Sequence, residues 1–337
     1  MDWELRQWPI QGPAAGGVPD LTIDTAWRDA GANVTLVISS GLHGVEGPFG
    51  AAVLQRFFEA WMSSTAPPPA NVLAIHALNP YGYACGRRAD GLNRDLNRNF
   101  LLTGQPYSGA PELYRRLNWF INPPSPPRRL DLALLAAPWI VARYGMRRLA
   151  QALAEGQYEF PSGLFYGGAG AAPQHEVLAG LLNNYLHQSD TVLHMDLHTG
   201  LGTPGQCMLI CDHDLRPDQR DQMQDWFPGH TIRLVAQQQS AYAARGSLGR
   251  WIHAQQFCPD FRYVCLEVGT QSAARVLLAM REENRAHHWS APHTPAYRRA
   301  KLRMWEAFYP RRPEWAERAA SSATELILHA LSRLGGT

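Results

Sequence analysis

Short runs of aliphatic residues alternate along the chain with longer segments in which apolar residues recur every three or four positions. The short runs are typical of strands buried on both faces, and the longer segments are typical of amphipathic helices that cover them. The expected strands are Val34–Ser39, Val72–Leu78, Thr191–Leu197, Met208–Cys211 and Tyr263–Val268, and the expected helices are Pro48–Met62, Leu132–Glu155, Val177–His187 and Glu314–Leu334. We therefore predict an α/β fold with a mixed, mostly parallel twisted sheet flanked by helices.

The chain of 337 residues is expected to form one domain, residues 1–337, with a helical insertion around 102–188. The proline-rich segment 122–129 cannot lie inside a helix or a central strand, so we interpret it as a connection or as the start of an inserted lobe. The glycine-rich segment 163–172 is expected to be a plain surface loop, and a loop near the functional site is the alternative.

Composition excludes several classes of protein. Hydrophobic residues make up 45% of the chain and charged residues 18%, which is typical of a globular protein and not of a disordered one. The formal net charge of +2 provides no electrostatic drive toward nucleic acid. We find no signal peptide and no span of about 18 apolar residues, so we expect no membrane partner. The five cysteines form no C-x-x-C pair, which favours a reducing cytoplasm, and the oligomeric state is not indicated.

The first candidate for chemistry is a histidine and a glutamate three residues apart, His43 and Glu46, between an expected strand and an expected helix. Imidazole nitrogen and carboxylate oxygen are both ligands of Zn²⁺. The second candidate is His198, which stands where the strand of T-V-L-H-M-D-L-H-T-G gives way to a glycine turn. His194 lies on the same strand face and competes with His198 as a third ligand.

Two further segments carry charged side chains. Arg87 and Arg88 precede the run D-L-N-R-N-F, residues 95–100, and guanidinium groups beside asparagine amides suit a carboxylate. Glu267 interrupts an apolar strand just before a glycine, where burial raises the pKa of a carboxyl group and makes it a candidate general base. His43, Asn79, His198 and Glu267 all fall at or just beyond the carboxyl ends of different expected strands, the edge at which open α/β sheets bind ligands.

Between about Val34 and Gln271 the chain resembles the zinc carboxypeptidase superfamily, and most closely a largely uncharacterised bacterial branch of it. The resemblance rests on five motifs in order: H-x-x-E, N-P-x-G, D-L-N-R-N-F, D-L-H-T-G and a strand that ends in a glutamate. It implies one Zn²⁺ ion held by His43, Glu46 and His198, with Glu267 activating the water molecule at the zinc. The superfamily also contains the related succinylglutamate desuccinylase and aspartoacylase deacylases.

The resemblance assigns roles to the neighbouring residues as well. Asp95 is expected to orient His43 through its second ring nitrogen. Asn97 and Arg98 match the positions that hold the terminal carboxylate of the substrate. Arg88 matches the arginine that polarises the scissile carbonyl, and the adjacent Arg87 is an alternative. Finally, Tyr242 resembles the mobile tyrosine that closes over the substrate.

These observations predict a zinc metallopeptidase, a cytoplasmic hydrolase that cleaves an amide bond next to a free carboxylate. Its substrate would be a small peptide or an N-acyl amino acid. One alternative is an N-acyl amino acid deacylase, because D-L-H-T-G also occurs in the related deacylases. Another is a non-catalytic binding protein on the same fold, which the filled set of catalytic positions disfavours.

Overall fold

The computed structural model describes residues 3–12, 16–63, 69–235 and 244–334. Its strands are β1 (Glu4–Pro9), β2 (Thr22–Arg28), β3 (Val34–Ser40), β4 (Asn71–His76), β5 (Thr191–Pro204), β6 (Cys207–Cys211), β7 (Ile232–Leu234) and β8 (Asp260–Gly269). Its α-helices are α1 (Gly47–Met62), α2 (Pro80–Cys85), α3 (Glu112–Ile121), α4 (Ala137–Tyr144), α5 (Met146–Ala154), α6 (Gln174–Leu186), α7 (Pro217–Trp226), α8 (Leu248–Gln255), α9 (Ala273–Trp289), α10 (Pro295–Phe308) and α11 (Pro313–Leu334). Short 3-10 helices include η2 (Gly44–Glu46), η3 (Leu96–Arg98) and η4 (Leu132–Ala136). Within the described ranges, none of the helices combines the length and the apolar character that a bilayer crossing requires.

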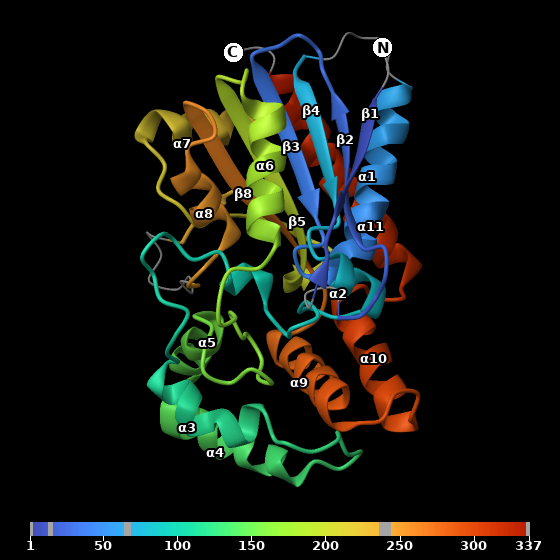
Figure 1. Cartoon of the computed structure of the whole chain (residues 1–337), viewed down its shortest axis with the longest axis vertical. Coiled ribbons are helices and arrows are strands. Elements are labelled where there is room, and N and C mark those ends of the chain that lie inside the picture. Colours follow the sequence, from blue (N-terminus) through green and yellow to red (C-terminus); the bar gives the residue numbers. More distant parts are fainter. Residues whose placement is uncertain (1–2, 13–15, 64–68, 236–243, 335–337) are drawn as a thin grey trace.

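The strands form one sheet in the order β1-β2-β4-β3-β5-β8-β6-β7 (Figure 1). The four central strands, β4, β3, β5 and β8, are parallel to one another. On either side, β2 runs antiparallel to β4, and β6 runs antiparallel to β8. This confirms the predicted mixed sheet and all five expected strands. The chain also forms β1, β2 and β7, whose side chains are mostly partly or fully exposed and therefore show no continuous apolar run.

Alternate side chains of the central strands enter two separate cores. Leu36 and Ile38 of β3 pack with α1, α7 and α11 on one face, whereas Val37 packs with α6 and α8 on the other. Figure 1 shows α6 and α8 in front of the sheet and α1 and α11 on its other side. Because both faces are covered, the central strands are apolar at consecutive positions, which is the pattern that made them recognisable in the sequence.

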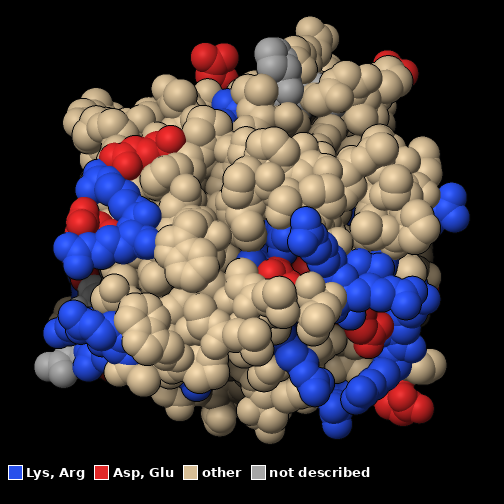
Figure 2. Space-filling model, turned by 90° about the horizontal axis from the view of Figure 1, so that it is seen from below, with Lys and Arg blue, Asp and Glu red and all other residues tan. Residues whose placement is uncertain are grey.

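The helices α3, α4, α5, α9 and α10 lie beyond the carboxyl ends of the central strands, in the lower part of Figure 1. They enclose a third core that includes Tyr114, Met280 and Phe308. The single helix expected over Leu132–Glu155 is interrupted, because Gly145 has a φ of +77° and separates α4 from α5. Seen from below, this end shows Lys and Arg side chains bordering broad uncharged areas (Figure 2).

The expected insertion divides into two parts in the structure. Residues 112–154, with α3, α4 and α5, pack mainly on the third core. The later helix α6, by contrast, packs directly on the sheet through Leu178, Leu181 and Leu182, which are all completely buried. The segment thus supplies both a lobe beyond the sheet and one of the helices that cover it.

Candidate metal centre and active site

The residues of the candidate metal centre are positioned by tight backbone turns at the carboxyl edge of the sheet. After β3, Gly41 adopts a φ of +69° and directs the chain toward His43, which immediately precedes η2. A Cβ atom at Gly44 would lie only 2.0 Å from the carbonyl carbon of Gly82, so glycine is required where these two backbones meet. As a result, His43 and Glu46 are held against the end of the neighbouring strands.

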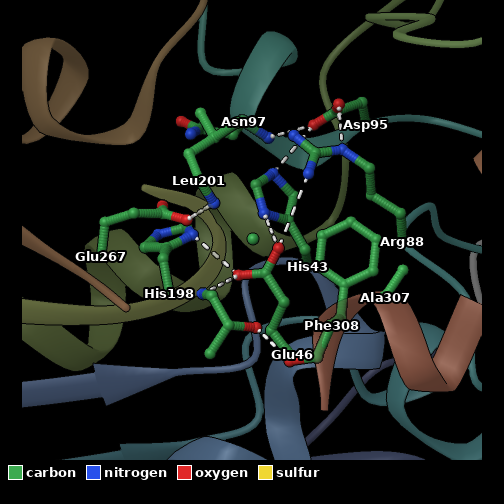
Figure 3. A network of polar contacts seen from close by, with 12 residues as sticks. His43, Glu46, Arg88, Asp95, Asn97, His198, Leu201, Glu267, Ala307 and Phe308 are labelled. Carbon is green, nitrogen blue, oxygen red and sulfur yellow. Dashed lines mark hydrogen bonds and ion pairs between the residues drawn. The ribbon is translucent and has the colours of Figure 1, made fainter. Parts of the chain in front are cut away.

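Three side chains converge there (Figure 3). Glu46 Oε1 lies 2.9 Å from His43 Nδ1, and Glu46 Oε2 lies 3.0 Å from His198 Nδ1. All three residues are buried, and one potential ligand atom from each lies within 4.8 Å of the others. The structure therefore brings together the three residues that the sequence predicted as metal ligands.

The contacts of the two Nε2 atoms, the ring nitrogens that point away from Glu46, indicate whether His43, Glu46 and His198 suit a cation. His43 Nε2 lies 3.3 Å from Asp95 Oδ1, and His198 Nε2 lies 2.6 Å from Asp196 Oδ2. A neutral imidazole carries one N–H, and a carboxylate at Nε2 draws that proton to the outer nitrogen. Both Nδ1 lone pairs then face the Glu46 carboxylate, an arrangement that a cation between them would stabilise. Two imidazole nitrogens and one carboxylate are a donor set that Zn²⁺ accepts, so the residues fit this ion.

Asp196 has no assigned role in the sequence analysis, although it shares a strand face with His198. Its Oδ1 accepts a hydrogen bond of 2.6 Å from Ser39 Oγ, and its Oδ2 accepts one of 3.0 Å from Tyr263 Oη. His194 Nε2 lies 2.6 Å from the same Ser39 hydroxyl. His194 thus contacts Ser39 and is not one of the three residues that could hold the metal, whereas His198 is one of them.

Glu267 stands beside His198, because the two residues are cross-strand partners in β8 and β5. Its Oε1 accepts a hydrogen bond of 2.7 Å from the backbone N–H of Leu201. Burial, and next the negative charge of Glu46, raise the pKa of Glu267 to about 7. A pKa near neutrality suits a group that accepts a proton in one step and returns it in the next.

A second group that could hold a cation consists of His198, Cys265 and Glu267, whose potential ligand atoms also lie within 4.8 Å of one another. It shares His198 with the first group. We favour the first group because the outer nitrogens of both its histidines face carboxylates, and because it leaves Glu267 available for proton transfer.

Arg88 and Asp95 adjoin the metal group on the other side. Arg88 Nε donates a hydrogen bond of 2.8 Å to Asp95 Oδ2, and Arg88 Nη1 lies 3.6 Å from Glu46 Oε1. Burial alone would raise the pKa of Asp95, but the charges of Arg88 and His43 hold it well below its usual range. Asp95 therefore remains a carboxylate that contacts both His43 and Arg88.

Asn97 and Arg98 lie next to this group but are engaged in contacts of their own. Asn97 Oδ1 accepts a hydrogen bond of 3.0 Å from the backbone N–H of Leu248, and Arg98 Nη1 donates one of 2.7 Å to the carbonyl of Asn97. The Arg98 side chain is buried. Binding of a substrate carboxylate by these residues is still a prediction, because the present contacts would have to be shared or exchanged.

The glycine-rich segment 163–172 is part of the surroundings of the site, which corrects our expectation of a plain surface loop. The carbonyl of Tyr166 accepts a hydrogen bond of 2.7 Å from the backbone N–H of Asp95. The ring of Phe165 lies 5.6 Å from the guanidinium carbon of Arg88 and 5.7 Å from that of Arg98. Phe165 has a φ of +56°, which is uncommon for a bulky residue, and its ring is near both arginines.

Arg87, the alternative substrate-binding residue, is held by contacts to the core. Its guanidinium is almost completely buried, and Nε donates a hydrogen bond of 3.0 Å to Glu283. Nη2 donates hydrogen bonds to Asn93 at 2.9 Å and to Asn284 at 3.4 Å. Arg87 therefore links the arginine segment to α9, and its role as an alternative substrate-binding residue stays a prediction. Tyr242, the candidate mobile tyrosine, lies outside the described residues.

A family model described as "Protein of unknown function (DUF2817)" matches residues 2–322. The chain belongs to the DUF2817 family. A search of curated proteins found no match to this DUF2817 protein.

Solved structures show which fold the DUF2817 protein shares. Bovine thrombin-activatable fibrinolysis inhibitor, in complex with tick carboxypeptidase inhibitor, matches with a TM-score of 0.51 at 10% identity, covering 98% of this chain and 90% of that chain. Carboxypeptidase A from Helicoverpa armigera matches with a TM-score of 0.45 at 14% identity, covering 96% and 69%. Succinylglutamate desuccinylase from Chromobacterium violaceum matches with a TM-score of 0.40 at 16% identity, covering 86% and 70%. The first of these matches confirms the predicted α/β fold, a mixed sheet flanked by helices.

Proposed function

We propose that this DUF2817 protein is a zinc-dependent hydrolase that cleaves an amide bond next to a free carboxylate. The observation that carries the proposal is the convergence of His43, Glu46 and His198, with Glu267 beside them on the neighbouring strand. The donor set suits Zn²⁺, and Glu267 is separate from that set. This is the division of labour that metal-assisted hydrolysis requires.

When bound, Zn²⁺ would supply a Lewis acid that polarises a carbonyl group and makes water a better nucleophile at neutral pH. Glu267 would accept the proton of the attacking water and deliver it to the leaving amine, a double role that suits its pKa of about 7. The N–H of Leu201 holds the Glu267 carboxylate in place for this transfer.

The arginines provide the rest of the chemistry. Arg88 is the partly exposed guanidinium beside the metal group, so it is the residue we assign to the developing oxyanion. Asn97 and Arg98 would hold the free carboxylate of the substrate, which places the adjacent amide over the metal group. A small peptide or an N-acyl amino acid meets these requirements, and we propose both as substrate classes.

The test compares Glu267→Gln with His198→Ala in protein loaded with zinc. Loss of a general base costs about 10²–10⁴-fold in rate, so Glu267→Gln should keep its zinc and lose turnover by that factor. The variant His198→Ala should lose the metal, as measured by metal analysis after gel filtration. Glu325→Gln, an exposed glutamate of α11, is the matched control and should change neither property.

The substrate screen uses a panel of peptides and a panel of N-acyl amino acids, each with and without a free carboxylate. Cleavage of peptides at the C-terminal residue would establish a carboxypeptidase, and cleavage of N-acyl amino acids alone would establish a deacylase. Normal turnover by Glu267→Gln would refute the assigned mechanism. Absence of zinc from protein purified without chelator would favour a non-catalytic binding protein.

A further inference from the structure

A helical segment at the lower end of the molecule exposes an unusual set of apolar side chains. About half of the large exposed hydrophobic residues of the described chain fall within residues 119–146. In η4 and α4, Leu132, Leu135 and Trp139 are 65%, 77% and 60% exposed. Their spacing of three and four positions places them on one side of the helical segment, and Ile140, the residue after Trp139, turns toward the core and is buried.

Arginines stand at both ends of this apolar side. Arg128 and Arg129 precede it, Arg143 follows it, and all three side chains are exposed. Within residues 3–12, 16–63, 69–235 and 244–334, no carboxylate forms an ion pair with any of the three. The intervening Asp131 is already paired with two arginines of α9, so it does not neutralise them.

We refer to Arg128, Arg129, Leu130, Leu132, Leu135, Trp139 and Arg143 as the basic-apolar ridge. Figure 1 shows α4 at the outer margin of the molecule, at the end opposite the two termini. From below, Lys and Arg are the prevailing charged side chains of this face (Figure 2). A positively charged apolar ridge requires a partner surface that is negatively charged and able to take up large hydrophobic side chains.

A second copy of the chain does not meet this requirement. A two-fold interface brings the same patch of both copies together, so the ridge would face itself and the arginines would face arginines. An anionic lipid surface does meet it, because its phosphates attract arginine while its interfacial region accepts tryptophan and leucine. This combination of side chains is typical of helices that lie in the plane of a membrane interface.

We propose that the basic-apolar ridge docks on an anionic lipid surface. Leu132, Leu135 and Trp139 enter the headgroup region, and the flanking arginines face lipid phosphates. The lack of a bilayer-crossing helix among the described residues is compatible with such docking, because the ridge would lie in the plane of the interface and would not cross it. The proposal rests on exposure and charge alone, and it is independent of the proposed hydrolase activity.

The experiment is co-sedimentation of the full-length protein with vesicles of phosphatidylcholine and with vesicles of phosphatidylcholine and phosphatidylglycerol in equal parts. Binding is expected only to the anionic vesicles, and it should weaken with added salt, because salt screens the arginine–phosphate attraction. Replacement of Arg128 and Arg129 together by Ala should weaken binding by about 25-fold, since each arginine near an anionic surface contributes about fivefold. The double variant Leu135→Glu/Trp139→Glu should abolish sedimentation.

Matched controls separate the ridge from general charge and hydrophobicity. The double variant Arg311→Ala/Arg312→Ala removes another adjacent, exposed pair of arginines, and Leu5→Glu removes an exposed leucine that is 76% accessible on β1. Both control variants should bind vesicles like the wild type. Thermal unfolding of every variant, followed by circular dichroism, verifies that each is folded.

Three results would overturn the proposal. The first is equal binding to neutral and anionic vesicles, or no binding to either. The second is self-association of the wild type in analytical ultracentrifugation that Leu135→Glu/Trp139→Glu abolishes, which would make the ridge an interface between copies. The third is binding of polyglutamate without binding of anionic vesicles, which would indicate an acidic protein partner.

Discussion

Replacement of Glu283 by Gln should destabilise the protein by about 3 kcal/mol at pH 7 and leave the metal group intact. Glu283 lies buried on α9, where it accepts hydrogen bonds of 3.0 Å from Arg87 Nε and 2.6 Å from Lys301 Nζ. One carboxylate therefore neutralises the buried Arg87 and the partly buried Lys301. In the variant, neither cation would keep this compensating charge.

The magnitude follows from the pKa of the carboxyl group. Burial alone would raise the pKa of Glu283, but the charges of Arg87 and Lys301 outweigh burial and lower it from 4.5 to about 2. At about 1.4 kcal/mol for each pH unit, this difference corresponds to about 3 kcal/mol of stability at neutral pH. Removing one partner of a buried ion pair typically costs about 3–5 kcal/mol, which is the same order.

The pH dependence has a definite sign. Because the pKa is lower in the folded protein than in the unfolded chain, the stabilisation is complete well above pH 4.5 and is lost as the pH falls toward 2. The difference between wild type and Glu283→Gln should therefore shrink by about 1.4 kcal/mol between pH 7 and pH 3.5.

Urea unfolding of both proteins at the two pH values measures this difference directly. The control is Glu282→Gln on the same helix, which removes the ion pair with the largely exposed Arg303 and should cost less than about 1 kcal/mol. A Glu283→Gln variant as stable as this control, or a difference independent of pH, would refute the reasoning. A stable variant that had lost substrate binding would instead support Arg87 as a substrate-binding residue.

Three further predictions concern the site. Asp196→Asn should lower zinc affinity by about 10–100-fold, because it alters the carboxylate that orients the His198 ring. Competition for zinc with a chromogenic chelator measures the affinity, and an unchanged value would show that Asp196 does not orient His198. Gly44→Ala should destabilise the fold by about 1–3 kcal/mol or more in thermal unfolding, because its Cβ would meet the backbone of Gly82. The control Gly180→Ala, which meets no atom within 4 Å in α6, should stabilise by about 0.5–1 kcal/mol. If the proposed function holds, Phe165→Leu should raise KM by about fivefold with little change in kcat, because it removes a ring that contacts Arg88 and Arg98. Steady-state kinetics measures both constants, and an unchanged KM would show that the ring has a structural role only.

The parts of the fold that could be predicted are the strands and helices whose burial requires a recognisable pattern of apolar residues in the sequence. The parallel strands β3, β4, β5 and β8 are covered on both faces and appear as apolar runs. Their carboxyl ends meet at one edge, so His43, Asn79, His198 and Glu267, which follow different expected strands, could be expected to lie at that edge. The structure does bring His43 and His198 together there, with Glu46 three residues after His43 and Glu267 on the strand beside His198.

The remaining features depend on which way a side chain points, which composition and spacing do not specify. Arg87 and Arg88 are identical and adjacent, yet one enters the core against α9 and the other faces the metal group. Phe165 contacts Arg88 and Arg98 from a backbone with a positive φ in a glycine-rich loop, a conformation that residue spacing does not predict. Asp196 could have been recognised, since it is a carboxylate two positions from His198 on the same buried strand face.

The two edge strands have a consequence for how copies of this protein behave together. At one edge, β1 carries Glu4, Arg6 and Pro9 on an exposed strand, and at the other edge β7 is only three residues long. Charges, proline and short length all disfavour the addition of a strand from another molecule. The folded chain therefore gives an incoming strand little to pair with at either end, so cross-β aggregation should require unfolding first.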